Sequence, residues 1–294
     1  MKILKLFGWA LLGLFVLFLV LIIIVAVFDY TTDDMKVRAI ERTTQPITEE
    51  CVSLFCAYLD KGNGVPVFEE LLSGITDTDI ILLQNCEESY IEKLGSLFES
   101  HNGYFSFSKR SPVTISSNGK VSFMDFSGLY SLSAYSPLEV KKLLLPTDTN
   151  WFSSLLSSMP STQILEFQNN GKQLFIINLD NVMNDQWESD DINTIRLEYI
   201  KTSIIETLPQ DGYFLIAGNW QNLLPGQSIM EENNSGEVIP LNWTKTGWQW
   251  VYPPDELIGY GVLASGNVQI KEVTFLETTS KKHPQAISLH FCLE

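Results

Sequence analysis

The chain has 294 residues, of which 45% are hydrophobic and 18% charged, and this balance excludes an intrinsically disordered protein. Its formal net charge of −16 repels phosphate backbones, so the composition argues against nucleic acid as a partner. The length is sufficient for one large domain or two small ones behind an N-terminal segment.

The N-terminus carries the clearest signal in the sequence. Lys2 and Lys5 precede an uncharged apolar run over residues 6–28, and a run of this length spans a bilayer when it is helical. Acidic residues follow from Asp29 onward. The positive-inside rule then places residues 1–5 in the cytoplasm and the body of the protein outside it.

A cleaved signal peptide is the alternative to this anchor. Its apolar region is shorter, about 7–15 residues, and ends at a small-residue cleavage site. The run here closes on Val27 and Phe28, which do not form such a site. We therefore expect a single-pass signal anchor over 6–28, a polar tether over 29–50 and a domain over 51–294. The membrane is then a partner through residues 6–28, and a bacterial origin is favoured.

Residues 79–86 form a short apolar run that ends in the polar side chains of Gln84 and Asn85. A run of this length that is rich in Ile and Leu predicts a strand buried on both faces. Polar residues at its end would lie at the rim of a sheet, where sites are usually built.

Apolar patterning and Asn-Gly turns predict the remaining elements. Single strands are expected over residues 52–59, 129–135, 213–217, 257–264, 268–276 and 286–293. Hairpins are expected over residues 113–123 and 163–179. The expected helices cover 67–72, a segment beginning at Ser89, and 185–208. Residues 137–162 receive no assignment, and 219–255 are expected to be a long loop. This order predicts two packed mixed sheets flanked by helices, an α/β sandwich.

Four cysteines occur without C-x-x-C or zinc-site spacing, namely Cys51, Cys56, Cys86 and Cys292. One interpretation is that all four are buried thiols. Outside the cytosol one bridge is possible, and Cys51 with Cys292 is the favoured pair, because these residues flank strands at the two ends of the domain.

Several segments resemble motifs of the metal-dependent endonuclease/exonuclease/phosphatase superfamily, in the order in which that family has them. Gln84-Asn85 resembles its Gln-Glu motif, in which the Glu binds metal. Further resemblances lie at residues 128–137, 176–179, 218–221, 259–265 and 280–284. The resemblance implies a four-layered α/β sandwich with its motifs at strand ends around one cleft.

The same resemblance implies that the catalytic residues have been replaced. The matching positions hold Ala57 for an Asn, Asn85 for the metal-binding Glu, Asn178 for the catalytic His, Asn219 for an Asp, Gln221 for a phosphate-binding Asn, Tyr260 for an Asp, and Lys281 and Lys282 for the final Asp and His. Framework residues of the motifs remain, among them Ser133, Gly218 and Ser265.

Phosphodiester hydrolysis in such a site needs a divalent cation held by carboxylates and a group that activates water. Because amides and lysines replace these groups, we expect no metal, no cofactor and no catalysis. The expected function is an extracytoplasmic binding or scaffold module. Two alternatives remain open: an active Mg-dependent phosphodiesterase, phosphatase or nuclease with other ligands, and an unrelated envelope protein with an α/β domain.

Two groups of residues are candidates for binding. Aromatic side chains on loops are frequent binding anchors, and the expected long loop holds Trp220, Trp243, Trp248 and Trp250. The alternative is that these rings fill the space left by the lost catalytic groups. Lys281 and Lys282 would attract an anion, so an unknown protein or a small anionic ligand is the expected partner.

Overall fold

The structure is a computed structural model of the chain. It describes residues 2–32, 36–59, 72, 74–115, 121–147, 159–181, 191–209, 211–220, 238–241, 247–251, 260–277 and 284–294.

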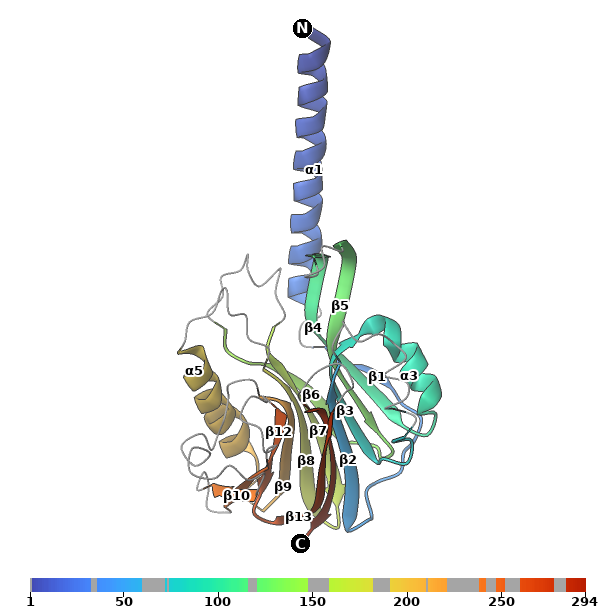
Figure 1. Ribbon diagram of the computed structural model, residues 1–294, viewed down its shortest axis with the longest axis vertical. Helices are drawn as coiled ribbons and strands as arrows, with labels where there is room; N and C mark the ends of the chain where they lie inside the picture. Colours follow the sequence, from blue (N-terminus) through green and yellow to red (C-terminus); the bar gives the residue numbers. More distant parts are fainter. Residues whose placement is uncertain are drawn as a thin grey trace.

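Two seven-stranded sheets pack face to face (Figure 1). The first sheet has the order β1 (Arg38–Ile40), β4 (Asn102–Ile115), β5 (Val121–Ser133), β3 (Ile80–Glu87), β2 (Cys51–Tyr58), β14 (Pro284–Leu293) and β13 (Val268–Glu277). The second has the order β10 (Val238–Leu241), β11 (Trp248–Val251), β12 (Tyr260–Ser265), β9 (Tyr213–Asn219), β8 (Lys172–Asp180), β7 (Ser161–Asn169) and β6 (Glu139–Leu144). Both sheets are mixed, because β2–β3 and β8–β9 are parallel while their other pairs are antiparallel.

Helices cover the outer faces of both sheets. The first sheet carries η1 (Glu88–Tyr90) and α3 (Ile91–Leu97), and Leu94 and Phe98 pack on its outer face. The second carries α5 (Ile192–Tyr199), the π-helical turn η2 (Ile200–Ile204) and η3 (Ile205–Thr207). Figure 1 shows α3 and α5 on opposite sides of the two sheets. The predicted α/β sandwich is confirmed.

Strand β3 shows how the sequence builds the core. Ile80 and Leu82 point between the two sheets, whereas Ile81 and Leu83 point to the outer face under α3. All four side chains are fully buried, which explains why this strand is a continuous apolar run instead of an alternating one. The prediction of a doubly buried strand over residues 79–86 is confirmed.

The predicted disulfide is also confirmed. Cys51 is bonded to Cys292, and the two residues face each other in the register of β2 and β14. The bond joins positions that are 241 residues apart in sequence. Cys56 and Cys86 are free and buried.

Three predictions of local structure need correction. In the described part of the helix predicted over 185–208, α5 ends at Tyr199 and the chain continues as the π-helical turn η2 and the 3₁₀ turn η3 to Thr207. The unassigned region 137–162 contains β6 and the start of β7. The region predicted as a loop over 219–255 contains the short strands β10 and β11, which extend the second sheet.

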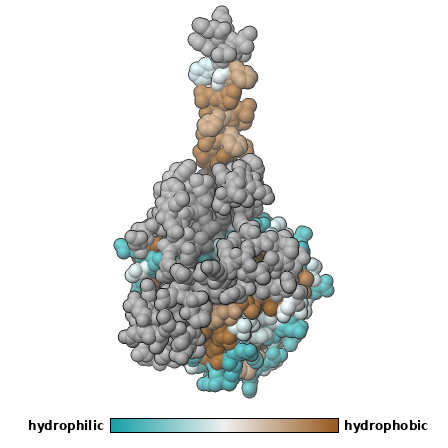
Figure 2. All heavy atoms as spheres, viewed as in Figure 1, coloured by the Kyte–Doolittle hydropathy of each residue, from teal (hydrophilic) through white to brown (hydrophobic). Residues whose placement is uncertain are grey.

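The N-terminal helix α1 (Lys2–Thr32) stands away from the sandwich, at the end where the β4–β5 hairpin projects (Figure 1). Its side chains are described over residues 7–23, where large apolar groups are exposed and form the brown column in Figure 2. Among the described residues, no helix is both long and apolar enough to cross a membrane.

Candidate functional site

Polar residues occupy two neighbouring rows on the face of the second sheet that packs against the first. In the deeper row, the strand register aligns Gln163 of β7 with Asn178 of β8. In the next row toward the strand ends, it aligns Asp180 of β8 with Asn219 of β9, and Asn219 with Tyr260 of β12. The structure therefore brings three predicted positions, at residues 178, 219 and 260, to one end of the sandwich.

Asn178 is held by the first sheet. Its Oδ1 accepts a hydrogen bond from Gln84 Nε2 at 2.5 Å, and its Nδ2 donates to Leu83 O at 3.3 Å and to Ser131 Oγ at 3.2 Å. Asn178, Gln84 and Ser131 are fully buried. Because the amide uses both of its ends inside the protein, it cross-links the two sheets.

The hydrogen-bonded network continues along the deeper row. Ser131 Oγ donates to Gln163 Oε1 at 2.5 Å, and Gln163 Nε2 donates to Tyr104 O at 3.1 Å and to Ser106 Oγ at 3.3 Å. Gln163 and Ser106 are also fully buried. A buried polar network of this kind is stabilising only while its members are paired, and here donors and acceptors of both sheets meet in the middle of the core. We call Gln84, Ser106, Ser131, Gln163 and Asn178 the amide network.

Asn85 adopts a positive φ of 52° at the end of β3, a conformation that Asn tolerates better than most residues. Its Nδ2 donates to Leu59 O at 2.7 Å, and its Oδ1 accepts from Ser127 Oγ at 3.1 Å. These bonds tie the end of β3 to residues that follow β2 and lie on β5. The side chain at the position of the expected metal-binding Glu is therefore neutral and internally bonded.

Asp180 is a site residue that the motif comparison missed. The carboxyl group is buried at 1% exposure, and its Oδ1 accepts a hydrogen bond from Asn219 Nδ2 at 3.2 Å. Burial raises the pKa of Asp180 to about 7, an effect that the hydrogen bond from Asn219 partly opposes. Strand alternation was the available signal, because Asp180 follows Asn178 by two residues and must share its face.

These residues do not fit a divalent cation. Hard cations such as Mg²⁺ are held mainly by ionised carboxylates and by water. Among the described residues, no three His, Cys, Asp or Glu side chains are grouped so that they could hold a metal ion. The described hydrogen-bond partner of Asp180 is the neutral amide of Asn219, and the carboxyl group is itself only partly ionised near neutral pH.

Arg196 is a second buried ionisable residue that the sequence analysis did not identify, and it contacts the segment that follows β8 from the outer side of the sheet. It is fully buried on α5, where Nε donates to Pro146 O at 2.8 Å and Nη1 donates to Asn181 Oδ1 at 3.1 Å. Asn181 Nδ2 in turn donates to Trp220 O at 3.1 Å. These bonds join the helix layer to the strand that carries Asp180.

The tryptophans are part of the core. Trp220, Trp248 and Trp250 are at most 2% exposed and pack beneath the helix layer of the second sheet. Trp220 Nε1 donates to Gly261 O at 3.1 Å, and the Trp220 and Trp250 rings meet edge to face at 4.9 Å. Their burial favours the alternative that these rings pack inside the protein, and β11 carries Trp248 and Trp250 within the second sheet.

The remaining predicted positions lie elsewhere or outside the described residues. Ala57 belongs to the apolar cluster on the outer face of the first sheet, so it points away from the cleft, while Cys56 next to it accepts a hydrogen bond from Gln84 at 3.2 Å. The alignment of Ala57 with a cleft residue is therefore wrong. The predicted positions outside the described residues are Gln221, Trp243, Lys281 and Lys282.

Solved structures share this arrangement of sheets and helices. An endonuclease/exonuclease/phosphatase from Beutenbergia cavernae superposes with a TM-score of 0.57 and 11% identity, over 83% of this chain and 72% of that one. A Bacteroides vulgatus protein of the same description gives 0.54 and 12% over 84% and 100% of the two chains. The catalytic domain of human Nocturnin, with a bound sulfate anion, gives 0.55 and 12% over 88% and 98%.

By sequence, no protein-family model and no curated protein matches the chain. The similarity therefore rests on three-dimensional structure, and it agrees with the motif order found in the sequence. The chain has the fold of the endonuclease/exonuclease/phosphatase superfamily.

Proposed function

We propose that this protein is a catalytically inactive member of the superfamily that acts as a binding or scaffold module. The observation that carries the proposal is the buried amide network. Asn178 stands where the family resemblance expects a catalytic His, and all of its described bonds go to the first sheet. An amide does not titrate near neutral pH, so it cannot act as a general acid or base, and a fully buried one does not reach a substrate.

The charge of the site supports the same proposal. An active metal-dependent phosphoesterase must hold a divalent cation against hydration, and this requires several carboxylates. The described strand ends contribute one buried carboxyl group, Asp180, together with the neutral side chains of Asn85 and Asn219.

We further propose that the module works outside the cytoplasm and is attached to a membrane by its N-terminal helix. The disulfide between Cys51 and Cys292 supports an oxidising compartment. The apolar side chains exposed along residues 7–23 of α1 support attachment to an apolar environment. The charge pattern of Lys2 and Lys5 before the helix supports the proposed orientation.

Metal titration of the full chain in detergent tests the inactive module. Calorimetry with Mg²⁺ and Mn²⁺ is expected to give no binding up to millimolar concentration, and a generic phosphodiester substrate is expected to stay intact. Binding at one site that disappears in Asn219→Ala, while the Gln168→Ala control retains it, would contradict the proposal.

A second candidate function is an active phosphoesterase that uses unusual residues. Asp180 favours it, because a carboxyl group whose pKa is near 7 is suited to proton transfer at neutral pH. In that case Asp180→Asn abolishes turnover of a phosphodiester substrate and leaves the fold intact. Absence of turnover in the parent chain decides against this candidate.

A small anion is the ligand that we propose for the cleft. The lysines at positions 281 and 282 supply positive charge in an acidic chain, and the similar Nocturnin structure contains a sulfate anion. Inorganic phosphate titrated into the full chain is expected to bind, and the double variant Lys281→Ala, Lys282→Ala is expected to lose it. Equal affinity in parent and variant contradicts the assignment.

A further inference from the structure

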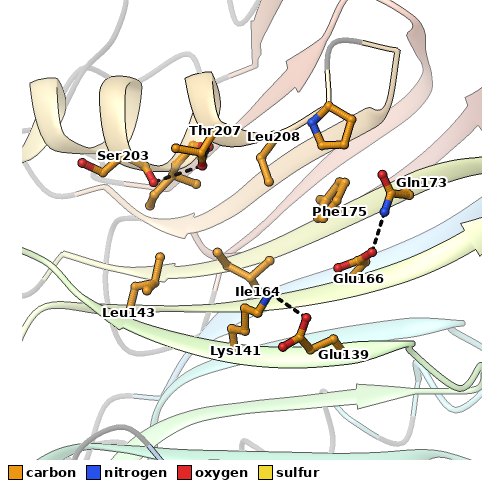
Figure 3. A pocket seen from close by; sticks show the side chains of 12 residues that line it. Glu139, Lys141, Leu143, Ile164, Glu166, Gln173, Phe175, Ser203, Thr207 and Leu208 are labelled. Carbon is orange, nitrogen blue, oxygen red and sulfur yellow. Dashed lines mark hydrogen bonds and ion pairs between the residues drawn. The ribbon is translucent and has the colours of Figure 1, made fainter.

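A cavity of about 320 Å³ lies between the outer face of the second sheet and the turns that follow α5 (Figure 3). Small-molecule sites usually begin at about this volume. The lining residues Ile164 of β7 and Phe175 of β8 belong to the outer apolar cluster, whereas Gln163 and Asn178 on the same two strands belong to the amide network. The cavity therefore opens on the opposite face of the sheet from the candidate cleft.

The cavity has apolar walls on two sides. The sheet contributes Leu143, Ile164 and Phe175, and the helical turns contribute Ile204 and Leu208. In Figure 3, Leu208 lies across the cavity from the side chains of the sheet. A short alkyl chain between these walls would lose its contact with water, which is favourable by about 0.8 kcal/mol for each buried methylene.

One side of the cavity carries an unusual arrangement of charge. Glu139 of β6 and Glu166 of β7 are directly opposite each other in the antiparallel register. Like charges in that position are destabilising. Both residues line the cavity, so the two carboxylates face the same small volume.

The protein neutralises this pair only in part. Lys141 Nζ lies 2.6 Å from Glu139 Oε2, and Gln173 Nε2 donates to Glu166 Oε1 at 2.7 Å. The hydrogen bond to Glu139, and then the charges of Glu139 and Glu166, raise the pKa of Lys141. Two carboxylates and one ammonium leave a net charge of −1 beside the apolar walls, and the neutral amide of Gln173 does not cancel it.

We propose that this cavity binds a small aliphatic amine, with its ammonium group beside Glu166 and its alkyl chain between the sheet and the helical turns. The cation supplies the second positive charge that the opposed glutamates lack. This cavity is separate from the candidate cleft, so the proposal of amine binding does not depend on whether the cleft is catalytic.

The test is calorimetric titration of the full chain in detergent with n-butylammonium, n-butanol and butanoate, which share one alkyl chain. Butylammonium is expected to bind at least about tenfold more tightly than butanol, the effect of one charge-assisted hydrogen bond. Butanoate is expected not to bind. Equal affinity for butylammonium and butanol, or no binding of butylammonium at millimolar concentration, overturns the proposal.

Two charge variants are expected to act in opposite directions. Glu166→Gln keeps the shape of the side chain and should weaken butylammonium binding about tenfold. Lys141→Ala removes the competing internal cation and should strengthen it. If both variants weaken binding, or neither changes it, the charge argument is wrong.

A substitution that fills the cavity tests whether the amine binds there. Ser203 lines the cavity, whereas the adjacent Thr202 is exposed and does not. Ser203→Phe should fill the cavity and abolish binding, and Thr202→Phe should leave the affinity unchanged. Circular dichroism establishes that both variants are folded. Retained binding in Ser203→Phe, or its loss in Thr202→Phe, places the amine elsewhere and overturns the proposal.

Discussion

The row through Asn178 and the row through Asp180 lie two residues apart on the same strand, yet burial has different energetic consequences for their side chains. The deeper row buries amides and hydroxyl groups whose partners come from the opposite sheet. The outer row buries a carboxyl group whose described hydrogen bond comes from one neighbouring amide. Neutral groups tolerate burial when they are hydrogen-bonded, whereas burial of a carboxylate that lacks a cationic partner favours its neutral form and raises its pKa.

The two rows should therefore differ in how their contributions to stability depend on pH. The deeper row contributes to stability at all pH values, because its members do not titrate in the neutral range. The outer row makes stability depend on pH, because the Asp180 carboxyl group exchanges a proton near neutrality. Variants in the two rows should therefore give different pH profiles.

The largest effect is expected from Asn178→Ala. The substitution removes the hydrogen bonds of the Asn178 side chain with Gln84 Nε2, Leu83 O and Ser131 Oγ, and each buried group that loses this bond costs about 1–3 kcal/mol. We expect the free energy of unfolding in urea to fall by about 4 kcal/mol in total. The loss should be the same at pH 5 and pH 8. Gln168→Ala, on the exposed part of β7, is the control and should change stability by less than about 0.5 kcal/mol.

Asp180→Asn should act in the opposite direction. The unfolded carboxyl group ionises near 3.8 and the folded one near 7, so the folded state binds the extra proton between these values. The contribution of Asp180 to the free energy of unfolding is therefore fully present below pH 4. It is lost as the pH rises through 7, by up to about 4 kcal/mol. The variant should lack this fall and be more stable at pH 8. A pH profile identical to that of the parent would show that Asp180 does not titrate as a buried group.

A smaller change is expected from Asn219→Ala. Because the hydrogen bond from Asn219 lowers the pKa of Asp180, its removal should raise that pKa further. The fall in stability with pH should then move to higher pH. Carboxyl chemical shifts in an NMR titration of the full chain measure the midpoint directly. A midpoint that moves downward would contradict the assignment of the hydrogen bond.

The smallest effect tests whether the two rows are coupled. Asn178 and Asp180 share a strand but have different described partners. The double variant Asn178→Ala, Asp180→Asn should therefore show stability changes that add within about 0.5 kcal/mol. A larger coupling energy would mean that the rows form one network.

The sequence allowed much of the fold to be predicted, because the signals were local. The apolar run of β3, the antiparallel pair β4–β5 and the cysteine pair were each predicted from short patterns. The motif order identified the fold that a solved structure shares at 12% sequence identity, and one motif residue has a clear structural requirement. Gly218 is an example: its φ is 148°, and a Cβ there would lie 2.0 Å from Leu179 O.

The site was harder to predict because its properties depend on contacts between distant segments. The pKa of Asp180 follows from burial that no local pattern encodes. Ala57 was assigned to the cleft, although a one-residue difference in register reverses the face of a strand. The tryptophans were expected on a loop because β10 and β11 have four residues each, too few for a clear strand pattern.

The bond between Cys51 and Cys292 has a consequence for proteolysis. It closes nearly the whole domain into a covalent ring, because it joins the first strand of the sandwich core to the last. A protease that cuts the ring once leaves two fragments that are still linked. Such a nicked domain would migrate as one species on a denaturing gel without reductant and separate into two bands when the disulfide is reduced.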